Sequence, residues 1–432
     1  LYTSDVHCGI DENIGYAGVA AYKKDMEKEY RYVVMADCGD FTQGAYESAV
    51  SKGEYLVDIM NSVGYDFAVI GNHEFDWGLE TISIYWDGDD TNGEANFPFV
   101  CCNLIDSKTG LRPDYCDPYA IIKYGDLKVG VIGAIGDTLE SSVSISSIGS
   151  YYFDNLDGYI GKYTDELKNE KNCDIVILSV HDYDDYDKYS KYVETLEYPI
   201  NAFIFGHTHQ SLDGYYRNPS TNEYVPYIEC YTKNLNIGTI ILEVENKKVV
   251  DSTTNHYNKG YFDYYVKTPN KACEDALIVY KDLIELGDSA LCSINLYDYD
   301  SQSEVADLAI RAMMDALGAD VGFVNTGGVR VKKFTNENLT YADINEAFPF
   351  DNKLCYSYMT GYNLKEYLYY NSNIFLNLSF NERNILDTKI YKVCTIDYVV
   401  TNYGYFIEFS EDNKVYYTED ILRDVIADYL RK

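Results

Sequence analysis

The stretch Asp66-Phe67-Ala68-Val69-Ile70-Gly71-Asn72-His73-Glu74-Phe75-Asp76 decides how the rest of the chain is interpreted. Its first five residues are a short, largely apolar run, which predicts a buried strand. Asn72 and His73 follow, so two side chains able to bind a metal or move a proton lie just past a strand's end. Open α/β sheets carry their ligands and catalytic groups there. An isolated Asn-His pair is also typical of a surface turn. A functional interpretation therefore depends on whether similar side chains follow other predicted strands.

Four other apolar runs end in side chains of the same chemistry. Segment 1–7 predicts a strand ending in Asp5 and His7, 32–36 leads to Asp40, 174–180 leads to His181, and 200–205 leads to His207 and His209. Residues two apart on an extended chain point to the same side, so Asp5 and His7 can reach one metal ion, as can the two later histidines. The alternative interpretations are a solvated strand end for Asp5 and His7, a turn residue for Asp40, and a surface pair for His207 and His209.

These five strand ends supply nitrogen and oxygen ligands, which suit Zn²⁺, Mn²⁺ or iron better than a thiolate site would. The groups exceed the needs of one ion, so two ions sharing a bridging Asp40 are the economical assignment. Strands that alternate with helical segments, such as 45–63, predict an α/β sandwich. We treat Asn103 and Asp137, which follow two further strands, as structural.

Length and composition narrow the function. A chain of 432 residues predicts two domains, and its net charge of −35 argues against nucleic-acid or anionic-membrane partners. No run is long and apolar enough for a membrane span. Eleven cysteines without a CxxC pair predict buried free thiols. The chain begins with Leu, as expected of a processed or trimmed polypeptide.

The motifs Asp5-x-His7, Gly39-Asp40, Gly71-Asn72-His73-Glu74, His181 and Gly206-His207-x-His209 resemble those of the calcineurin-like metallophosphoesterases. The spacing that places Asp76 three residues after His73 resembles the 5′-nucleotidase / UDP-sugar hydrolase branch of this family. The resemblance implies a four-layer α/β sandwich with a smaller α/β substrate-binding domain joined by a linker helix. It places the first domain at 1–266, the linker helix at 267–287 and the second domain at 288–432.

The resemblance also implies roles for the site residues. One divalent ion (Zn, Mn or similar) would take Asp5, His7, Asp40 and His209, and a second would take Asp40, Asn72, His181 and His207. His73, oriented by Asp76, would stabilise the phosphoryl group and the leaving oxygen. A two-metal site generates a bridging hydroxide at neutral pH and clamps both oxygens of an in-line displacement. The ions would also supply the positive charge that an acidic protein needs to bind an anion.

In the second part of the chain, 268–286 predicts one helix with Thr268 as N-cap, Pro269 at its first position and Gly287 at its end. A helix over 303–317 and a strand over 320–324 are expected to follow.

The strand leads into a Gly-Gly segment that resembles the family's substrate loop, with Asn325, Gly327, Gly328 and Arg330 as its binding residues. Phe350 resembles the family's base-stacking aromatic, and the alternative is a hydrophobic loop without that role. Tyr398 is a candidate for the second base-stacking aromatic. Two departures weaken nucleotide recognition: 298–303 lacks the family's Arg, and 398–405 lacks its Gly-Gly-Asp loop.

The leading hypothesis is two-metal hydrolysis of phosphate esters, of the 5′-nucleotidase type, by a secreted, periplasmic or cell-surface protein. The expected partner is a small phosphate ester or nucleotide. One alternative keeps the chemistry and changes the substrate to a cyclic nucleotide, a nucleotide sugar or another phosphodiester. Another is a surface binding protein that has lost catalysis, against which the intact ligand set argues.

Overall fold

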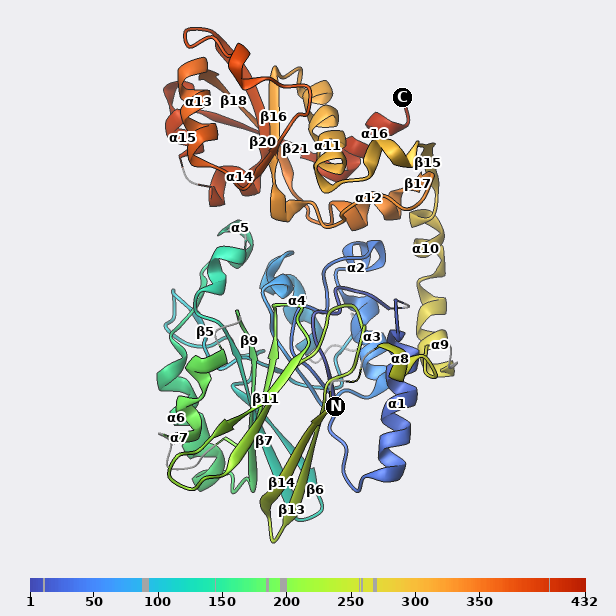
Figure 1. Ribbon diagram of the computed structural model, residues 1–432, viewed down its shortest axis with the longest axis vertical. Coiled ribbons are helices and arrows are strands. Elements are labelled where there is room, and N and C mark those ends of the chain that lie inside the picture. The colour runs from blue at the N-terminus through green and yellow to red at the C-terminus, as the bar shows by residue number, and fades with distance from the viewer. Residues whose placement is uncertain are drawn as a thin grey trace. The chain divides into compact units, whose positions relative to one another are not determined.

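The computed structural model describes residues 1–10, 12–87, 93–143, 145–183, 186–194, 200–255, 257, 259–266, 270–403 and 405–432. The chain divides into two compact units, one formed by Leu1–Gln43 with Val50–Lys281 and the other by Gly44–Ala49 with Asp282–Lys432. Both units are mixed α/β structures (Figure 1). None of the helices in the described ranges is long and apolar enough to cross a membrane.

Two sheets form the centre of the first unit. The smaller contains β1 (Tyr2–Thr3), β2 (Ala36–Asp37), β3 (Phe67–Val69) and β4 (Phe99–Val100), in that order and all parallel. The larger contains β6 (Tyr119–Tyr124), β7 (Leu127–Ile135), β9 (Ile175–His181), β10 (Ala202–Gly206), β11 (Leu212–Arg217) and β12 (Tyr224–Glu229). Its order is β11-β12-β10-β9-β7-β6, with four parallel strands between two antiparallel edge strands. The antiparallel pairs β5 (Leu104–Asp106) with β8 (Tyr151–Phe153) and β13 (Thr239–Glu245) with β14 (Lys248–Asn255) complete the strands.

The first unit is the expected four-layer sandwich. Along β7, Val131 packs between the two sheets, whereas its neighbour Ile132 packs in the core that contains Ile160 of the helix α6. This alternation follows the two-residue period of a strand, and burying each such side chain contributes roughly 1.5–3 kcal/mol. Helices α1 and α3 lie on one side of the sheets, and α6 and α7 lie on the other (Figure 1). The helices of this unit are α1 (Gly15–Glu29), α3 (Glu54–Val63), α4 (Leu79–Ser83), α5 (Ile145–Ile148), α6 (Leu156–Asp165), α7 (Lys191–Glu194), α8 (Lys259–Phe262) and α9 (Lys271–Val279), with α2 (Tyr46–Ser51) spanning the division.

The prediction of one continuous helix over 45–63 is wrong. The segment forms α2 and α3, which are separated by Lys52 and Gly53 at φ values of 54° and 101°. Both values lie in the left-handed region, which ends a right-handed helix and which Gly adopts without a steric penalty. A buried stripe with helical spacing therefore indicated the right face but did not reveal the break.

The opening strand is also shorter than expected, because only Tyr2–Thr3 is extended. Asp5 and His7 have φ values of 52° and 48°, so they do not project side by side from an extended chain. Their backbone N–H groups bond to the carbonyls of Gly39 and Asp40 at 2.9 and 3.0 Å. These bonds hold the loop after β1 against the loop after β2, and they replace the strand geometry from which the shared side of Asp5 and His7 was predicted.

The second unit contains a five-stranded sheet in the order β19-β16-β20-β18-β21 and a two-stranded pair, β15 with β17. Its strands are β15 (Ala290–Ser293), β16 (Val321–Asn325), β17 (Asn338–Thr340), β18 (Lys353–Thr360), β19 (Ile374–Leu376), β20 (Ile390–Ile396) and β21 (Val415–Ile421). Its helices are α10 (Lys281–Gly287), α11 (Gln302–Leu317), α12 (Tyr341–Ala347), α13 (Gly361–Tyr370), α14 (Asp397–Asn402), α15 (Phe406–Phe409) and α16 (Leu422–Leu430). The predicted helix at 303–317 begins after an N-cap bond from Glu304 N–H to Ser301 and ends at Gly318, whose φ is 61°.

The segment predicted as a single helix over 268–286 contains two, α9 and α10, so that prediction is wrong. Its expected start at Thr268 and Pro269 lies outside the described residues. Tyr280 separates the two helices. Its hydroxyl donates to Asp58 at 2.8 Å, and its ring meets the ring of Tyr55 edge-on at 4.8 Å.

Candidate metal centre

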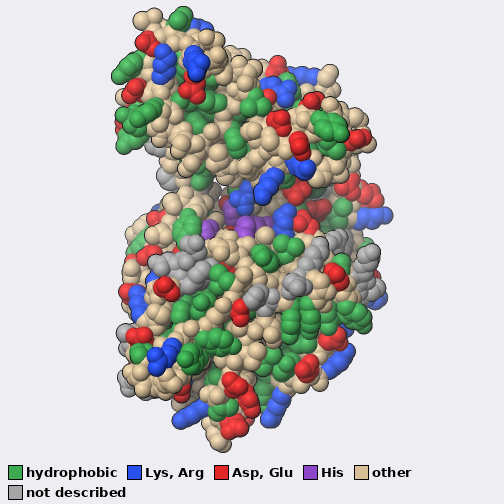
Figure 2. Space-filling model, in the orientation of Figure 1, with side chains coloured by type: hydrophobic (Ala, Val, Ile, Leu, Met, Phe, Trp, Pro, Cys, Tyr) green, Lys and Arg blue, Asp and Glu red, His purple; other side chains and the backbone are tan. Residues whose placement is uncertain are grey.

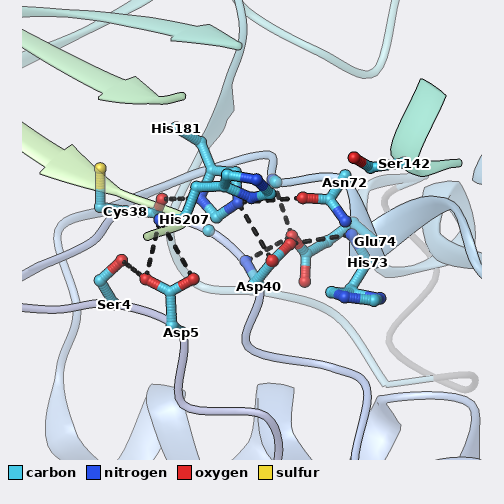
Figure 3. Close-up of polar contacts among 12 residues, drawn as sticks. Ser4, Asp5, Cys38, Asp40, Asn72, His73, Glu74, Ser142, His181 and His207 are labelled. Atoms are coloured by element: carbon cyan, nitrogen blue, oxygen red, sulfur yellow. Dashed lines mark hydrogen bonds and ion pairs between the residues drawn. The ribbon is translucent and has the colours of Figure 1, made fainter. Parts of the chain in front are cut away.

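The loops that follow four strands of the first unit meet the end of a fifth strand at one place (Figure 3). They follow β1, β2, β3 and β10, and β9 itself ends at His181. The register pairs His181 with Gly206 of β10 and with Ile135 of β7, so these strands end at the same level. Histidine side chains gather at one place on the visible face of the molecule (Figure 2). The structure therefore brings together the side chains that the sequence places at strand ends.

The predicted ligands form two groups, Asp5 with His7 and His209, and Asp40 with His181 and His207. Within each group the ligand atoms lie within 4.8 Å of one another. In the first group, the Nε2 atoms of His7 and His209 are 3.0 Å apart, and the His209 Nε2 is 3.4 Å from Asp5 Oδ1. Three donors of this type at such distances fit a divalent cation.

In the second group, Asp40 and His181 are fully buried and His207 is partly buried. His181 Nε2 lies 3.0 Å from Asp40 Oδ2 and 3.3 Å from the side-chain oxygen of Asn72. The ring nitrogen Nδ1 of His207 is buried and has no hydrogen-bond partner among the described residues. Buried polar atoms are normally satisfied. An orphaned imidazole nitrogen next to a carboxylate therefore fits a ligand whose metal would occupy the site.

Backbone carbonyls fix the tautomers of two of these histidines. His7 Nδ1 lies 3.1 Å from the carbonyl of Gln43, and His181 Nδ1 lies 2.8 Å from the carbonyl of Cys38. A carbonyl only accepts hydrogen bonds, so Nδ1 carries the proton in each neutral ring and the Nε2 lone pair is directed toward the other ligands. Metal-binding histidines are commonly held in this way.

Without an ion, the second group has the electrostatics of a buried ion pair. Burial alone would lower the pKa of His181, but the adjacent Asp40 carboxylate raises it to about 10. Burial opposes ionisation of Asp40 as well, yet His181 and neighbouring histidines hold the pKa of that carboxyl well below its usual range. Burial and the charge of His181 lower the pKa of His207 to about 4, so this ring is neutral and able to bind metal at pH 7.

The backbone of the site is strained. Asp5, His7, Asp40, His207 and His209 all have positive φ, between 48° and 96°. Side chains other than Gly rarely adopt this region, and such residues cost about 1–3 kcal/mol each. Five of the seven predicted metal ligands share this strain, which indicates that the fold holds them for a purpose other than stability.

His73 and Asp76 form a separate dyad at the edge of the two groups. His73 Nδ1 lies 2.9 Å from Asp76 Oδ2, and both side chains are only about a tenth exposed. The His73 ring meets the His7 ring edge-on at 5.2 Å. A proton held at Nδ1 by Asp76 leaves Nε2 to act on a substrate, which is the arrangement a general acid or an electrostatic stabiliser requires.

Sequence reasoning missed two buried acids beside the ligands. Glu229, at the end of β12, accepts bonds from the N–H (3.1 Å) and hydroxyl (2.7 Å) of Thr208, which lies between His207 and His209. Glu74 accepts bonds from the loop that carries Asp40. Nothing in the sequence marks Glu229, but Glu74 belongs to the motif Gly71-Asn72-His73-Glu74. Asn103, treated as structural, donates to the carbonyls of Ile135 and Asp154 in agreement with that role.

The residues predicted to bind substrate lie in the second unit. The buried side-chain oxygen of Asn325 has no hydrogen-bond partner in the described ranges, and a Cβ added at Gly328 would lie 2.6 Å from it. The guanidinium of Arg330 is 6.0 Å from the ring centroid of Phe350. Tyr398 lies at the start of α14, and its ring centroid is 6.2 Å from that of Tyr403.

The loop that carries Phe350 is held by an arginine that the sequence analysis did not identify. The buried Arg423 donates to the carbonyls of Pro349 (3.3 Å) and Phe350 (3.1 Å) and pairs with Asp351. Tyr403 is a further unpredicted residue here, because its phenol interacts with the side chain of Asn325.

All eleven cysteines are free, and all except the partly exposed Cys292 are buried.

The fold and the convergent Asp and His side chains define a metallophosphoesterase with an additional C-terminal domain. Residues 1–211 match the family described as calcineurin-like phosphoesterase, and 293–381 match 5′-nucleotidase, C-terminal domain. The chain thus joins a calcineurin-like phosphoesterase domain to a 5′-nucleotidase C-terminal domain.

Similar proteins have several names. The chain is 25% identical to a 5′-nucleotidase of Vibrio parahaemolyticus over 85% of its own length and 73% of that protein. It is 24% identical to Endonuclease YhcR of Bacillus subtilis over 80% of its length, but it spans only 29% of that protein. The structure of a 5′-nucleotidase precursor from Thermus thermophilus covers all of this chain and 95% of that one, with a TM-score of 0.78 at 17% identity, which shows the shared fold.

Proposed function

We propose that this protein hydrolyses phosphate esters with two divalent metal ions, and that nucleotides are its substrates. The observation that carries the proposal is the convergence of two Asp/His groups whose ring nitrogens are directed into the site by backbone carbonyls. Asp5, His7, Asp40 and His209 would hold one ion, and Asp40, Asn72, His181 and His207 the other. Bound ions would supply Lewis acidity and the positive charge that attracts a phosphoryl group.

His73 is the catalytic residue in this proposal. Asp76 accepts the Nδ1 proton and orients the ring, so a proton on Nε2 would be donated to the phosphoryl oxygens or to the leaving group. The proposed ligand sets are complete without His73, so its ring is not needed to hold an ion and would act on the substrate instead. Donors of this kind contribute roughly 10²- to 10³-fold to turnover.

The proposal that nucleotides are the substrates rests on residues of the second unit. Arg330 is suited to an anionic group, Phe350 to a flat ring, and the unsatisfied oxygen of Asn325 to a hydroxyl or N–H donor. A phosphodiesterase is the second candidate, because 298–303 offers no arginine for a terminal phosphate and one relative is named an endonuclease. We further propose a secreted, periplasmic or cell-surface location, in keeping with the family resemblance.

The test is a substrate panel with the metal-reconstituted protein. Chelator-treated protein is loaded with Zn²⁺ or Mn²⁺ and assayed for phosphate release from nucleoside monophosphates, a nucleotide sugar and p-nitrophenyl phosphate. Cleavage of bis(p-nitrophenyl) phosphate is measured in parallel. The proposal expects the highest kcat/KM on a nucleoside monophosphate. A preference for diesters would favour the second candidate, and no metal-dependent hydrolysis of any ester would refute both.

A further inference from the structure

Glu74 is a fully buried carboxylate to which the proposed chemistry gives no role. It lies in the turn that follows β3 and accepts five hydrogen bonds. Its Oε2 accepts from the backbone N–H groups of Asp40 (2.8 Å) and Gly71 (2.7 Å), and its Oε1 accepts from the N–H groups of Phe41 (3.0 Å) and Thr42 (3.2 Å) and from the Thr42 hydroxyl (3.1 Å). Four of these donors are backbone groups, so one side chain fixes main chain in two loops.

The two loops are the ones that carry Asp40 and Asn72, and they are in close contact. A Cβ at Gly71 would lie 2.3 Å from Asp40 Oδ1, so the approach requires glycine there. Asp40 has a φ of 58°, a conformation that a loop held only by its own backbone would tend to leave. Glu74 binds the N–H of Asp40 itself and those of the next two residues, which is where restraint is needed.

The restraint determines where the Asp40 carboxylate points. Its Oδ1 accepts the N–H of His73 at 2.8 Å, and its Oδ2 lies 3.0 Å from His181 Nε2 (Figure 3). A carboxylate that bound two ions would have to be held in one orientation. Both side-chain oxygens of Glu74 accept hydrogen bonds from these loops, so removing an acceptor atom leaves buried N–H groups unpaired and the loop free to relax.

We infer that Glu74 is the positioning residue of the site: it clamps the Asp40 loop to the Gly71 loop and so sets the geometry in which Asp40 serves two metal ions. The metal-sharing part of this inference depends on the proposed function, whereas the clamp itself does not. The two parts are tested separately.

The clamp is tested on metal-free protein by amide hydrogen exchange with mass-spectrometric detection. Glu74→Gln keeps the side-chain volume but can accept with only one oxygen. We expect exchange in 36–45 to accelerate at least tenfold, with little change in 120–135. The control is Asp66→Asn, which removes a carboxylate that accepts the N–H of Met35 at 2.8 Å at the opposite end of β3. The Asp66→Asn variant should leave hydrogen exchange in residues 38–45, which follow β2, unchanged.

The positioning role is tested with Mn²⁺. The parent should show the electron paramagnetic resonance spectrum of an exchange-coupled Mn²⁺ pair, and E74Q should show mainly uncoupled ions. Its kcat should fall about 10- to 100-fold with KM within twofold, as is typical when an outer residue orients a ligand. D66N should match the parent in both. If E74Q does not fold, Glu74→Asp, which keeps the charge and shortens the reach, is measured instead with the same expectation.

Unchanged exchange in 36–45 overturns the inference whatever the metals do. A coupled spectrum and a kcat within twofold of the parent overturn the positioning role. If the parent itself has no coupled pair while exchange rises as expected, metal sharing in the proposed function fails and the clamp stands.

Discussion

Replacing Asp40 by Asn in the metal-free protein should destabilise the first unit by an amount that depends on pH. Asn keeps an oxygen for the His73 N–H but removes the charge opposite His181, whose side chain is fully buried. Breaking a buried ion pair by removing one partner costs about 3–5 kcal/mol. At pH 7 we therefore expect the free energy of unfolding to fall by roughly that amount.

The pH dependence follows from the direction of the His181 shift. Its pKa is about 10 in the folded protein, above the ordinary value of 6.5, so the folded state retains a proton that the unfolded state has lost between these two values. The contribution is complete below pH 6.5 and disappears as the pH rises through 10. Each pH unit in this window removes up to about 1.4 kcal/mol, so most of the difference between parent and D40N should be gone near pH 9.5.

Tryptophan fluorescence during urea unfolding measures this effect cleanly. The chain has two tryptophans, Trp77 and Trp86, and both lie in the first unit. Tyrosines and lysines that titrate in the same range do so in both proteins, and their effects cancel in the difference. A difference below about 1 kcal/mol at pH 7, or one that is equal at pH 7 and pH 9.5, would show that Asp40 and His181 are not the charged pair described here.

Three further outcomes are expected. His73→Gln should keep its metal content, measured by elemental analysis, while kcat falls roughly 10²- to 10³-fold; near-parental turnover would exclude a catalytic role. Phe350→Ala should raise KM for a nucleoside monophosphate severalfold but leave p-nitrophenyl phosphate unaffected, because a ring contact contributes uniform binding; equal effects on both would exclude base stacking. Chelation should abolish activity and lower the unfolding temperature reported by Trp77 and Trp86, and Zn²⁺ or Mn²⁺ should restore both; an activity that resists exhaustive chelation would argue against metal catalysis.

The location of the site was predictable from sequence because strand ends have a simple signature. A buried apolar run followed by Asn72 and His73, or by His181, identifies the edge of the sheet without any knowledge of the loops. The conformation of the loops was not predictable in this way. Asp5 and His7 were expected to share a side because they are two residues apart on a strand. Both instead adopt a left-handed backbone, and their side chains come together with His209 by a different path.

Tertiary contacts account for much of what sequence patterns left out. Thr208 is held by Glu229, which comes from the neighbouring strand, and the Phe350 loop is held by Arg423 from the last helix. Such partners are separated from what they support by about twenty to seventy residues, and no local pattern connects them. The breaks at Gly53 and Tyr280 were missed for a related reason, since a periodic apolar stripe continues across a short interruption.

The overall charge would give the proposed metal ions a second role, which is to attract the anionic substrate. With a net charge of −35 the protein repels anions, and the site itself adds Asp5, Asp40 and the buried Glu74. Two divalent ions carry four positive charges against the two carboxylates that would bind them directly, so the loaded site alone would reverse the local sign. An anionic ester would then be attracted only at short range, against a repulsive field that salt screens over about 10 Å at 0.1 M. Added salt should therefore hinder substrate association with this enzyme less than it hinders association with a site lined by Lys and Arg, because screening weakens the distant repulsion more than the buried attraction.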